Sequence, residues 1–354
     1  MNRPSGHIII AATILAALQT VCGCSRIDGP VVEPTAVSGV EISLKPAAEA
    51  STKAPVEGTV MPDLYTIYLS AYISQSEKEN IGDYFTEVPF TKDATSGLWR
   101  ANPARYWPIA SEIDLLAVAC DAAEFALPGN AIYNRDNCTK GVVIDVAGIL
   151  NSEIMYSSTR HQVGEYYGVG GLSFNPYVET KSTPLTDGNA GIAMEFGHTQ
   201  AWLHFNLSAS SDAQAFIVES LQVRDLYKGG ELTIYRTNPV TSEPEADWYF
   251  GGVRTSNLDL VETETTVHAA GSLSFDCLIP EQKKREVLLT VRYLSEDAAD
   301  GALSGEMIYT IAPEDSDWLK GRKYTYNIIL TPTGIRSTVD VEGWAVYNHL
   351  EQDL

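Results

Sequence analysis

Residues 193–207 read AMEFGHTQAWLHFNL. Aromatic and other large apolar side chains occupy this stretch at the density expected of strands in antiparallel sheets. No regular alternation of strands with helical segments is found along the chain, which excludes a doubly wound α/β fold. The second half of the chain is therefore predicted to be all-β. Five later segments are also rich in aromatic and β-branched residues, at residues 216–226, 230–237, 286–294, 305–312 and 323–332.

The first half of the chain carries the same signal. Val40, Ile42 and Leu44 alternate with polar residues, which is the period of a half-buried strand. Gly and Pro turn signals separate the segments that follow. We expect this half to be all-β as well. Its further predicted strands are residues 63–74, 112–120 and 141–150.

The length of the chain, 354 residues, suggests two domains at roughly 150 residues each. A stretch rich in Gly, Pro and Asn at residues 167–189 separates the two halves. We therefore predict two antiparallel β-sandwich domains in tandem, at residues 39–190 and 191–354.

The charge of the chain excludes one class of partner. Lys and Arg number 24 against 46 Asp and Glu, so the formal net charge is −22, and no long segment is rich in Lys and Arg. Such a field repels phosphate backbones. We expect no nucleic acid partner.

The first residues resemble the signal of a bacterial lipoprotein. An apolar run at residues 8–18 has the length of a secretory signal core but is too short to span a bilayer. It leads to VCGC (21–24), in which Cys24 follows a small residue and fits the acceptor position for a diacylglyceryl group. We expect residues 1–23 to be removed and residues 24–38 to form a lipidated tether. The alternative is an ordinary signal peptide that contains two Cys.

The remaining cysteines and the histidines indicate no metal site. Cys120, Cys138 and Cys277 form an odd set without a CxxC pair. Cys120 and Cys138 can pair in an oxidising compartment, or they can be buried thiols. His198 and His204 lie six residues apart on one predicted strand, roughly 20 Å at 3.3 Å per residue, too far for one metal ion. We expect no metal and no cofactor.

No motif of a known enzyme class is present. The chain has no GxSxG, HExxH, GxxxxGK[ST] or EF-hand loop, and its Gly-rich residues 168–171 do not lead into a helix. We expect no catalytic residue. Two alternatives stay open. One is a glycan-binding lipoprotein that stacks rings such as Tyr166, Tyr167 and Tyr177 on sugars, and the other is a β-sandwich glycosidase with two carboxylates.

A series of short patterns along the chain resembles the fimbrillin family of Bacteroidales, two-domain lipoproteins that build type V pili. Each pattern alone is weak, but their order and spacing cover nearly the whole mature chain. The resemblance implies transthyretin-like β-sandwich domains, and a structural or adhesive role at the outer membrane. The matching segments are 99–100 (WR), 105–108 (RYWP), 112–119, 153–157 (EIMYS), 194–207, 277–280 (CLIP), 318–326 (WLKGRKYTY) and 339–344 (VDVEGW).

The resemblance also implies a mode of assembly. In polymerising members a protease cuts after a basic residue beyond the first strand, and the vacated place accepts a strand from another subunit. Here Val40, Ile42 and Leu44 would belong to the exchangeable strand, and Lys53 would be the residue at which the precursor is cut. The implied partners are other fimbrial subunits, the outer membrane through the lipid on Cys24, and a surface receptor. The alternative for Lys53 is a solvated loop residue in an uncleaved anchor or tip subunit.

Overall fold

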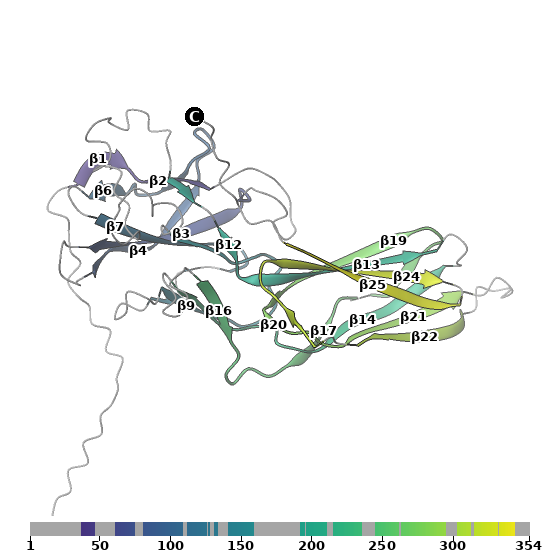
Figure 1. The fold of residues 1–354 in the computed structure, drawn as a ribbon. Helices are drawn as coiled ribbons and strands as arrows, with labels where there is room; N and C mark the ends of the chain where they lie inside the picture. The colour runs from purple at the N-terminus through teal and green to yellow at the C-terminus, as the bar shows by residue number, and fades with distance from the viewer. Residues whose placement is uncertain are drawn as a thin grey trace, which may run out of the picture.

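The computed structural model describes residues 37–46, 61–74, 81–108, 112–125, 127, 131–133, 141–158, 192–194, 196–210, 215–235, 245–261, 263–294, 303–312, 315–331 and 333–343. All regular secondary structure in these ranges is β-strand, β1 to β25, which confirms the all-β prediction. The same residues form no apolar helix of membrane-spanning length. The strands gather in two lobes (Figure 1).

The N-terminal lobe is built on a sheet of eight strands. In spatial order they are β11 (Ile192–Met194), β2 (Ser43–Pro46), β5 (Trp99–Ala101), β4 (Ile81–Lys92), β3 (Tyr65–Ser74), β7 (Glu112–Asp121), β10 (Met155–Ser158) and β12 (Gly197–His198). At its centre β3 and β7 are antiparallel and pair over all ten residues, from Tyr65 opposite Asp121 to Ser74 opposite Glu112.

Both faces of β3 and β7 are buried over residues 65–71 and 115–120. Ile67 and Leu69 point into a core that the eight-stranded sheet encloses, while Tyr68 points into a second core on the opposite face. Strands covered on both sides read as continuous apolar runs because every side chain has an apolar neighbour. This explains why residues 115–120, LLAVAC, lack a polar face.

A four-stranded sheet covers that second core. Its order is β16 (Glu245–Tyr249), β15 (Gly230–Tyr235), β9 (Val142–Val146) and β8 (Ala131–Tyr133). Val142, Ile144, Leu232 and Ile234 face Leu116 and Val118 of β7 and its neighbours across this core.

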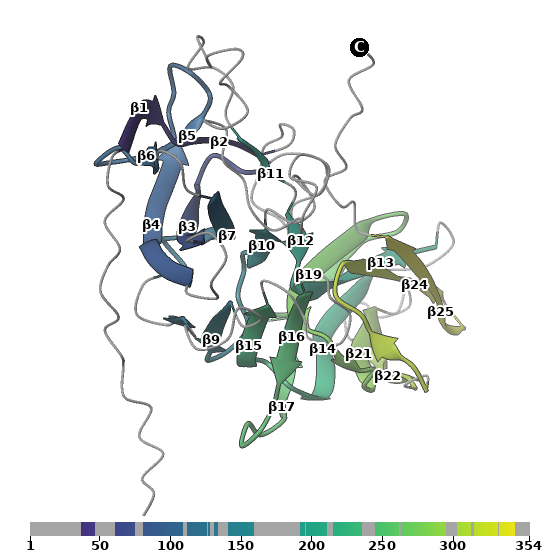
Figure 2. The ribbon, with the colours of Figure 1, turned by 60° about the vertical axis from the view of Figure 1, so that its left-hand side comes forward.

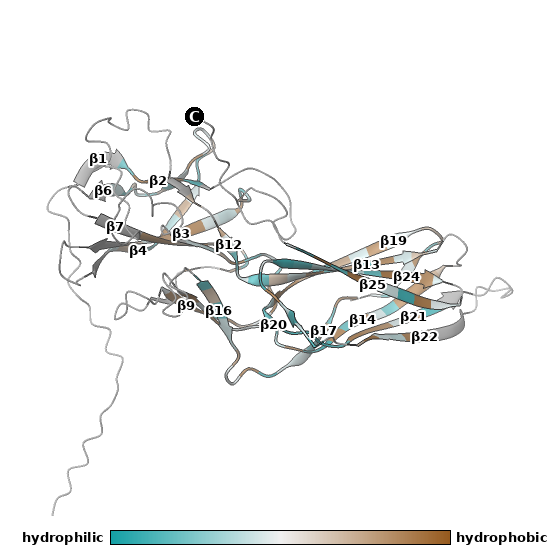
Figure 3. Ribbon diagram, in the orientation of Figure 1, coloured by the Kyte–Doolittle hydropathy of each residue, from teal (hydrophilic) through white to brown (hydrophobic). Residues whose placement is uncertain are grey.

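The C-terminal lobe is a sandwich of two sheets. One has the order β19 (Ser272–Pro280), β13 (Gln200–Ala209), β24 (Arg322–Thr331) and β25 (Gly334–Gly343). The other has the order β17 (Ser256–Asp259), β14 (Phe216–Leu226), β21 (Val287–Leu294) and β22 (Leu303–Ile311), with β18 (Thr265–Val267) also paired to β14. Alternate residues of each strand face inward, and Figure 3 shows hydrophobic segments along β14 and β21. Two further sheets of the described residues have two strands each: β1 (Val37–Glu41) pairs with β6 (Tyr106–Pro108), and β20 (Gln282–Lys283) pairs with β23 (Asp317–Trp318).

The pairing differs from the expected pattern in two ways. β2 with β11 and β13 with β24 are parallel, so the sheets are mixed rather than purely antiparallel. Hydrogen bonding also crosses residue 190, because β11 and β12 complete the first sheet and β15 pairs with β9. The division into two domains at that residue stays a prediction.

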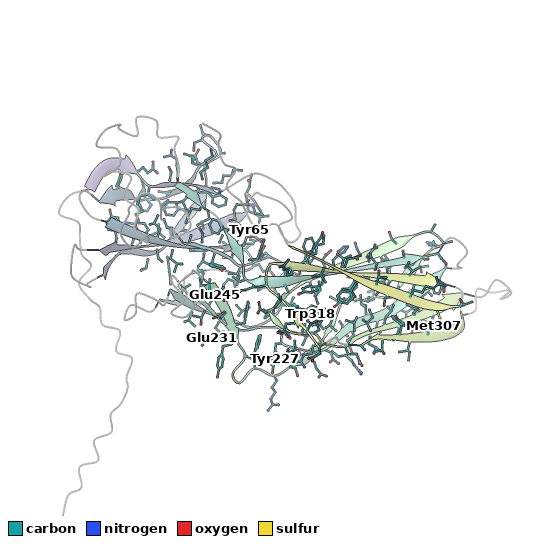
Figure 4. The ribbon with its side chains drawn as sticks, in the orientation of Figure 1. Tyr65, Tyr227, Glu231, Glu245, Met307 and Trp318 are labelled. Carbon is teal, nitrogen blue, oxygen red and sulfur yellow. The ribbon has the colours of Figure 1, made fainter. Side chains whose placement is uncertain are left out.

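A buried polar cluster joins the lobes where the chain passes from β12 to β13. Glu153 and His198 are both buried, and the Glu153 carboxylate is bonded to His198 Nδ1. The Glu153 N–H donates to the Tyr65 hydroxyl at 3.0 Å, and the Ile154 N–H donates to Gln200 Oε1 at 3.1 Å. Figure 4 labels Tyr65 at this junction. The carboxyl group is thus held inside the fold among fixed dipoles.

Replacing Glu153 should change how stability depends on pH. Burial raises the pKa of Glu153, although His198 partly opposes the shift. A raised folded-state pKa stabilises the fold below the ordinary glutamate range, and this contribution is lost as the pH rises through the folded-state value. Relative to Glu153→Gln, the unmodified protein should therefore lose stability as the pH rises above the ordinary glutamate range. Urea unfolding of both proteins at a series of pH values is the measurement.

A control separates this effect from the loss of one negative charge. Glu342 lies on β25 and is exposed. Glu342→Gln therefore removes one negative charge without changing a buried carboxyl group. A difference between Glu153→Gln and the unmodified protein that stays constant with pH contradicts the expected titration of Glu153.

Candidate functional site

The candidate site is the leading strand, defined here as residues 37–46, together with the strands that hold it. β1 pairs antiparallel with β6, and β2 lies between β5 and β11 (Figure 2). Leu44 is opposite Trp99 on the antiparallel side and opposite Ile192 on the parallel side. The leading strand is thus part of the sheet, with a backbone partner on each side of β2.

Sequence periodicity predicts one continuous strand here, whereas the structure interrupts it at Ile42. Between Val37 and Glu41 the register with β6 is irregular, which marks a bulge. The Ile42 N–H then donates to the carbonyl oxygen of Arg105 at 2.7 Å. The break therefore leaves the Ile42 N–H paired and turns the chain from β6 toward β5.

The side chains of Ile42 and Leu44 lie in the core of the N-terminal lobe, each with 0% exposed. They are two residues apart and thus share one face of the strand. They belong to the same core cluster as Phe90, Trp99 and Met194. Full burial of an Ile or Leu side chain contributes about 1.5–3 kcal/mol, so the two together supply roughly 3–6 kcal/mol.

The residue between them is also covered. Ser43 points to the other face of the strand, and only 7% of it is exposed. Its Cα lies opposite that of Arg100 on β5. A small side chain suits this position because a larger one would have to displace its neighbours.

A charge pair lies at the end of β1. The carboxylate of Glu41 is paired with the guanidinium of Arg100, and each side chain is about one quarter exposed. Partial shielding from water strengthens such a pair compared with one on the open surface. The leading strand is therefore held by backbone hydrogen bonds, apolar burial and one ion pair.

Several residues predicted to form this site lie outside the described residues. The backbone of Val40 belongs to β1, but its side chain, like Cys24 and Lys53, falls outside the described parts of the chain. Lipidation at Cys24, cleavage at Lys53 and exchange of the strand therefore stay predictions.

The two predicted strand histidines occupy separate environments. His198 contacts Glu153 in the buried junction, whereas His204 on β13 bonds to Asp276 of β19 at 2.7 Å. In the described segments no group of three metal-ligating side chains comes together.

Cys120 is a buried free thiol that donates to the Phe125 carbonyl at 3.1 Å, and burial raises its pKa to about 12. It therefore serves as an apolar core residue.

The carboxylates of Glu245 and Asp247 on β16 have a structural partner. The ammonium group of Lys320 lies 3.7 Å from Glu245 and 3.5 Å from Asp247, and it also donates to the Ala246 carbonyl. This lysine belongs to the loop before β24, so the contact ties the two lobes together. Trp248 adds a second tie, since its Nε1–H donates to the Thr199 carbonyl at 2.5 Å.

Exposed aromatic rings are scattered among the described residues. Tyr106 is on β6 and Tyr249 on β16, and these strands belong to different sheets. The tyrosines considered for sugar stacking, Tyr166, Tyr167 and Tyr177, fall in a stretch that the structure leaves undescribed.

Comparison with protein families decides the identity of the chain. The model of the fimbrillin-like family matches residues 52–344. The chain belongs to the fimbrillin-like family. Membership in this family supports the role of a fimbrial subunit at the cell surface rather than that of an enzyme. The matched range begins after the leading strand.

Solved structures similar to this fimbrillin-like chain share little sequence with it. A candidate cell adhesion protein from Bacteroides uniformis is 15% identical with a TM-score of 0.48, and the alignment covers 86% of this chain and 99% of that one. A fimbrial protein from Bacteroides vulgatus is 13% identical with a TM-score of 0.40, covering 86% and 100%. The tip fimbrial protein Mfa3 from Porphyromonas gingivalis is 12% identical with a TM-score of 0.34, covering 79% and 94%. No curated protein matches the chain significantly.

Sequence reasoning missed three neighbours of the leading strand in this fimbrillin-like protein. β11 as a parallel partner, Arg100 as the partner of Glu41, and Arg105 as the acceptor of the Ile42 N–H all come from distant parts of the chain. Residues 99–100 and 105–108 carry a family resemblance in the sequence, but their local pattern does not predict contact with the leading strand.

Truncating Leu44 should destabilise the fimbrillin-like fold strongly. Leu44→Ala removes a fully buried side chain and should lower the free energy of unfolding by about 2–5 kcal/mol. Lys45→Ala changes the next residue, whose side chain is exposed, and should stay within about 0.5 kcal/mol. Urea unfolding followed by tryptophan fluorescence compares them. Equal effects of the two substitutions would contradict the placement of Leu44 in the core.

Proposed function

We propose that this fimbrillin-like protein is made as a lipoprotein precursor and assembles into a filament by strand exchange. In this scheme the leading strand occupies its place in the sheet until a cut after Lys53 frees it from the body. A strand of a neighbouring subunit then takes the place of β2. The observation that supports this proposal is the position of β2, paired on both sides and burying Ile42 and Leu44.

The physical driving force for exchange lies in what the departing strand leaves behind. Loss of β2 would expose the facing edges of β5 and β11, where each buried group without a hydrogen bond costs about 1–3 kcal/mol. It would also open the core around Trp99 and Met194 to water. An incoming strand satisfies the same groups, which is the principle of β-augmentation.

The cut matters because covalent attachment holds the leading strand at a high effective concentration. While residues 37–46 belong to the same chain as the body, an external strand competes poorly for the β2 site. After cleavage both strands compete as separate molecules. The proteolytic step therefore acts as the switch between a stable precursor and a subunit ready for assembly.

The contact formed in this way is head to tail. The surface that donates a strand and the surface that receives it are different, so the contact does not close between two copies and can extend into a fibre. This geometry agrees with the fimbrial role of the family. A lipid on Cys24 would keep the precursor at the outer membrane until the cut separates the lipidated segment from the folded body.

Blocking the cut should block assembly. Lys53→Ala should keep the leading strand covalently attached and abolish incorporation into surface filaments, whereas the unmodified subunit in filaments should begin at Ala54. Lys45→Ala removes the lysine within the leading strand, whose side chain is exposed, and should leave filaments unchanged. Filament purification with determination of the subunit N-terminus is the measurement. Filaments built from subunits that keep residues 37–46 would contradict strand exchange.

Lipidation can be tested separately. Cys24→Ala should abolish incorporation of radiolabelled palmitate into the precursor, because Cys24 is the proposed acceptor of the lipid. Cys120→Ala is the matched control, since Cys120 is a buried thiol inside the folded body. Palmitate labelling that survives Cys24→Ala would show that the acceptor lies elsewhere.

A further inference from the structure

The outer face of the sheet formed by β8, β9, β15 and β16 carries a row of exposed side chains. Leu232 and Ile234 of β15 face the core, so the alternate residue Glu231 lies on the outer face. Glu231 is opposite Asp145 of β9 on one side and opposite Tyr249 of β16 on the other. All three residues are exposed, and they form one row across the sheet.

The ring of Tyr249 ends this row beside a tight turn. Tyr249 is 65% exposed, and a Cβ atom added at Gly251 would lie only 2.2 Å from its Cε1 atom. The Val253 N–H donates to the Phe250 carbonyl at 3.0 Å, and Gly252 between them has a φ of 83°, so these residues form a turn. The ring is therefore supported by the glycine backbone on one side and is otherwise open to solvent.

The segment that follows the ring is anchored at both ends. The ring of Phe250 stacks on that of Tyr227 with their centroids 4.3 Å apart. Ser256 lies opposite Leu226 in the pairing of β17 with β14. Because the two anchors fall on adjacent residues, the short segment between them stays close to this part of the chain. Arg254 belongs to that segment and is exposed.

A second cation, Lys228, directly follows Tyr227. The backbone there is fixed by Gln282, whose Oε1 accepts from the Tyr227 N–H and whose Nε2–H donates to the Tyr227 carbonyl, both at 2.9 Å. The guanidinium of Arg285 lies over the Tyr227 ring, 5.9 Å from its centroid. Figure 4 labels Tyr227 between the two lobes. Lys228 and Arg254 therefore extend from fixed backbone in the same region as Tyr249.

Charges of both signs thus lie near Tyr249 without pairing. Lys228 and Arg254 are positive, and Asp145 and Glu231 are negative. None of these four side chains forms an ion pair within the part of the chain that the structure describes. Two carboxylates directly opposite each other on neighbouring strands are destabilising. An arrangement that does not serve stability indicates a functional surface.

We propose that Tyr249 and the four charged side chains around it bind a neutral pyranose residue of a glycan. The apolar face of a sugar ring packs on an aromatic ring, and each sugar hydroxyl both donates and accepts hydrogen bonds. Asp145 and Glu231 accept from these hydroxyls, while Lys228 and Arg254 donate to them. Because both signs lie close to the ring, the site does not select its ligand by net charge. The inference concerns adhesion and does not depend on strand exchange.

A single site of this kind binds weakly. Lys228 is partly buried and the other four residues are exposed, so every contact replaces one with water. We expect a Kd of about 1 mM for one site. A fimbria presents many copies of its subunit, and simultaneous contacts with one glycan-coated surface raise the effective affinity. Weak single contacts therefore suit an adhesive filament.

The test uses the purified full chain, uncut. The neutral probes are maltotriose, mannotriose and galactotriose, and the acidic probe is trigalacturonic acid. Binding is followed by saturation-transfer-difference NMR and quantified by titration. At least one neutral trisaccharide should bind with a Kd of about 1 mM, and the acidic trimer should bind no more tightly than the neutral ones.

Substitutions assign the binding to this surface. Tyr249→Ala should weaken it about tenfold, while Tyr249→Phe keeps the ring and should stay within about twofold. Glu231→Ala and Arg254→Ala should each weaken it about threefold through lost hydrogen bonds. Ile308→Ala is the control, because Ile308 on β22 is also 65% exposed, and it should bind like the unmodified protein. Urea unfolding checks that each variant is folded.

Three results would overturn the proposal. One is the absence of binding by every neutral trisaccharide at about 20 mM, some twentyfold above the expected Kd. Another is an affinity for the acidic trimer that exceeds every neutral affinity by about tenfold or more. The third is binding that Tyr249→Ala leaves unchanged. None of these results bears on strand exchange, because the chain is tested before any cut.

Discussion

The pairing of β3 with β7 is the constraint on which the N-terminal lobe depends. These two strands pair over ten residues, and residues 65–71 and 115–120 are buried on both faces, so each face needs a separate cover. The leading strand helps to enclose one core, and the sheet of β8, β9, β15 and β16 closes the other. Neither cover comes from neighbouring sequence alone, because β11 and β15 return from beyond residue 190. The lobe is complete only after much of the chain has folded back onto it.

Local patterns in the sequence predicted the strands better than their partners. The alternation at residues 40–44 and the apolar run at 112–120 each predict a strand, and both lie in strands. Periodicity reports which side chains are buried, but it carries no information on which distant strand supplies the neighbour. Residues 193–207 pass from β11 through β12 into β13, and β15 pairs with β9. Periodicity alone predicts neither feature.

The same limit applies to charges. Glu153 and His198 are 45 residues apart, and Glu41 and Arg100 are 59 apart, so neither pair leaves a local signature. The two pairs differ in burial, because Glu153 and His198 are fully buried whereas Glu41 and Arg100 are each about one quarter exposed. The first is sealed inside the junction and joins the lobes. The second joins the leading strand to β5 at a partly exposed position.

The mixed pairing around β2 has a consequence for any polymer built through it. Because β2 runs parallel to β11 and antiparallel to β5, a replacement that makes the same hydrogen bonds can enter in only one orientation. Every subunit would then point the same way along the fibre. Its two ends would differ chemically, one presenting a vacant site and the other an unused donor, and elongation would have a direction.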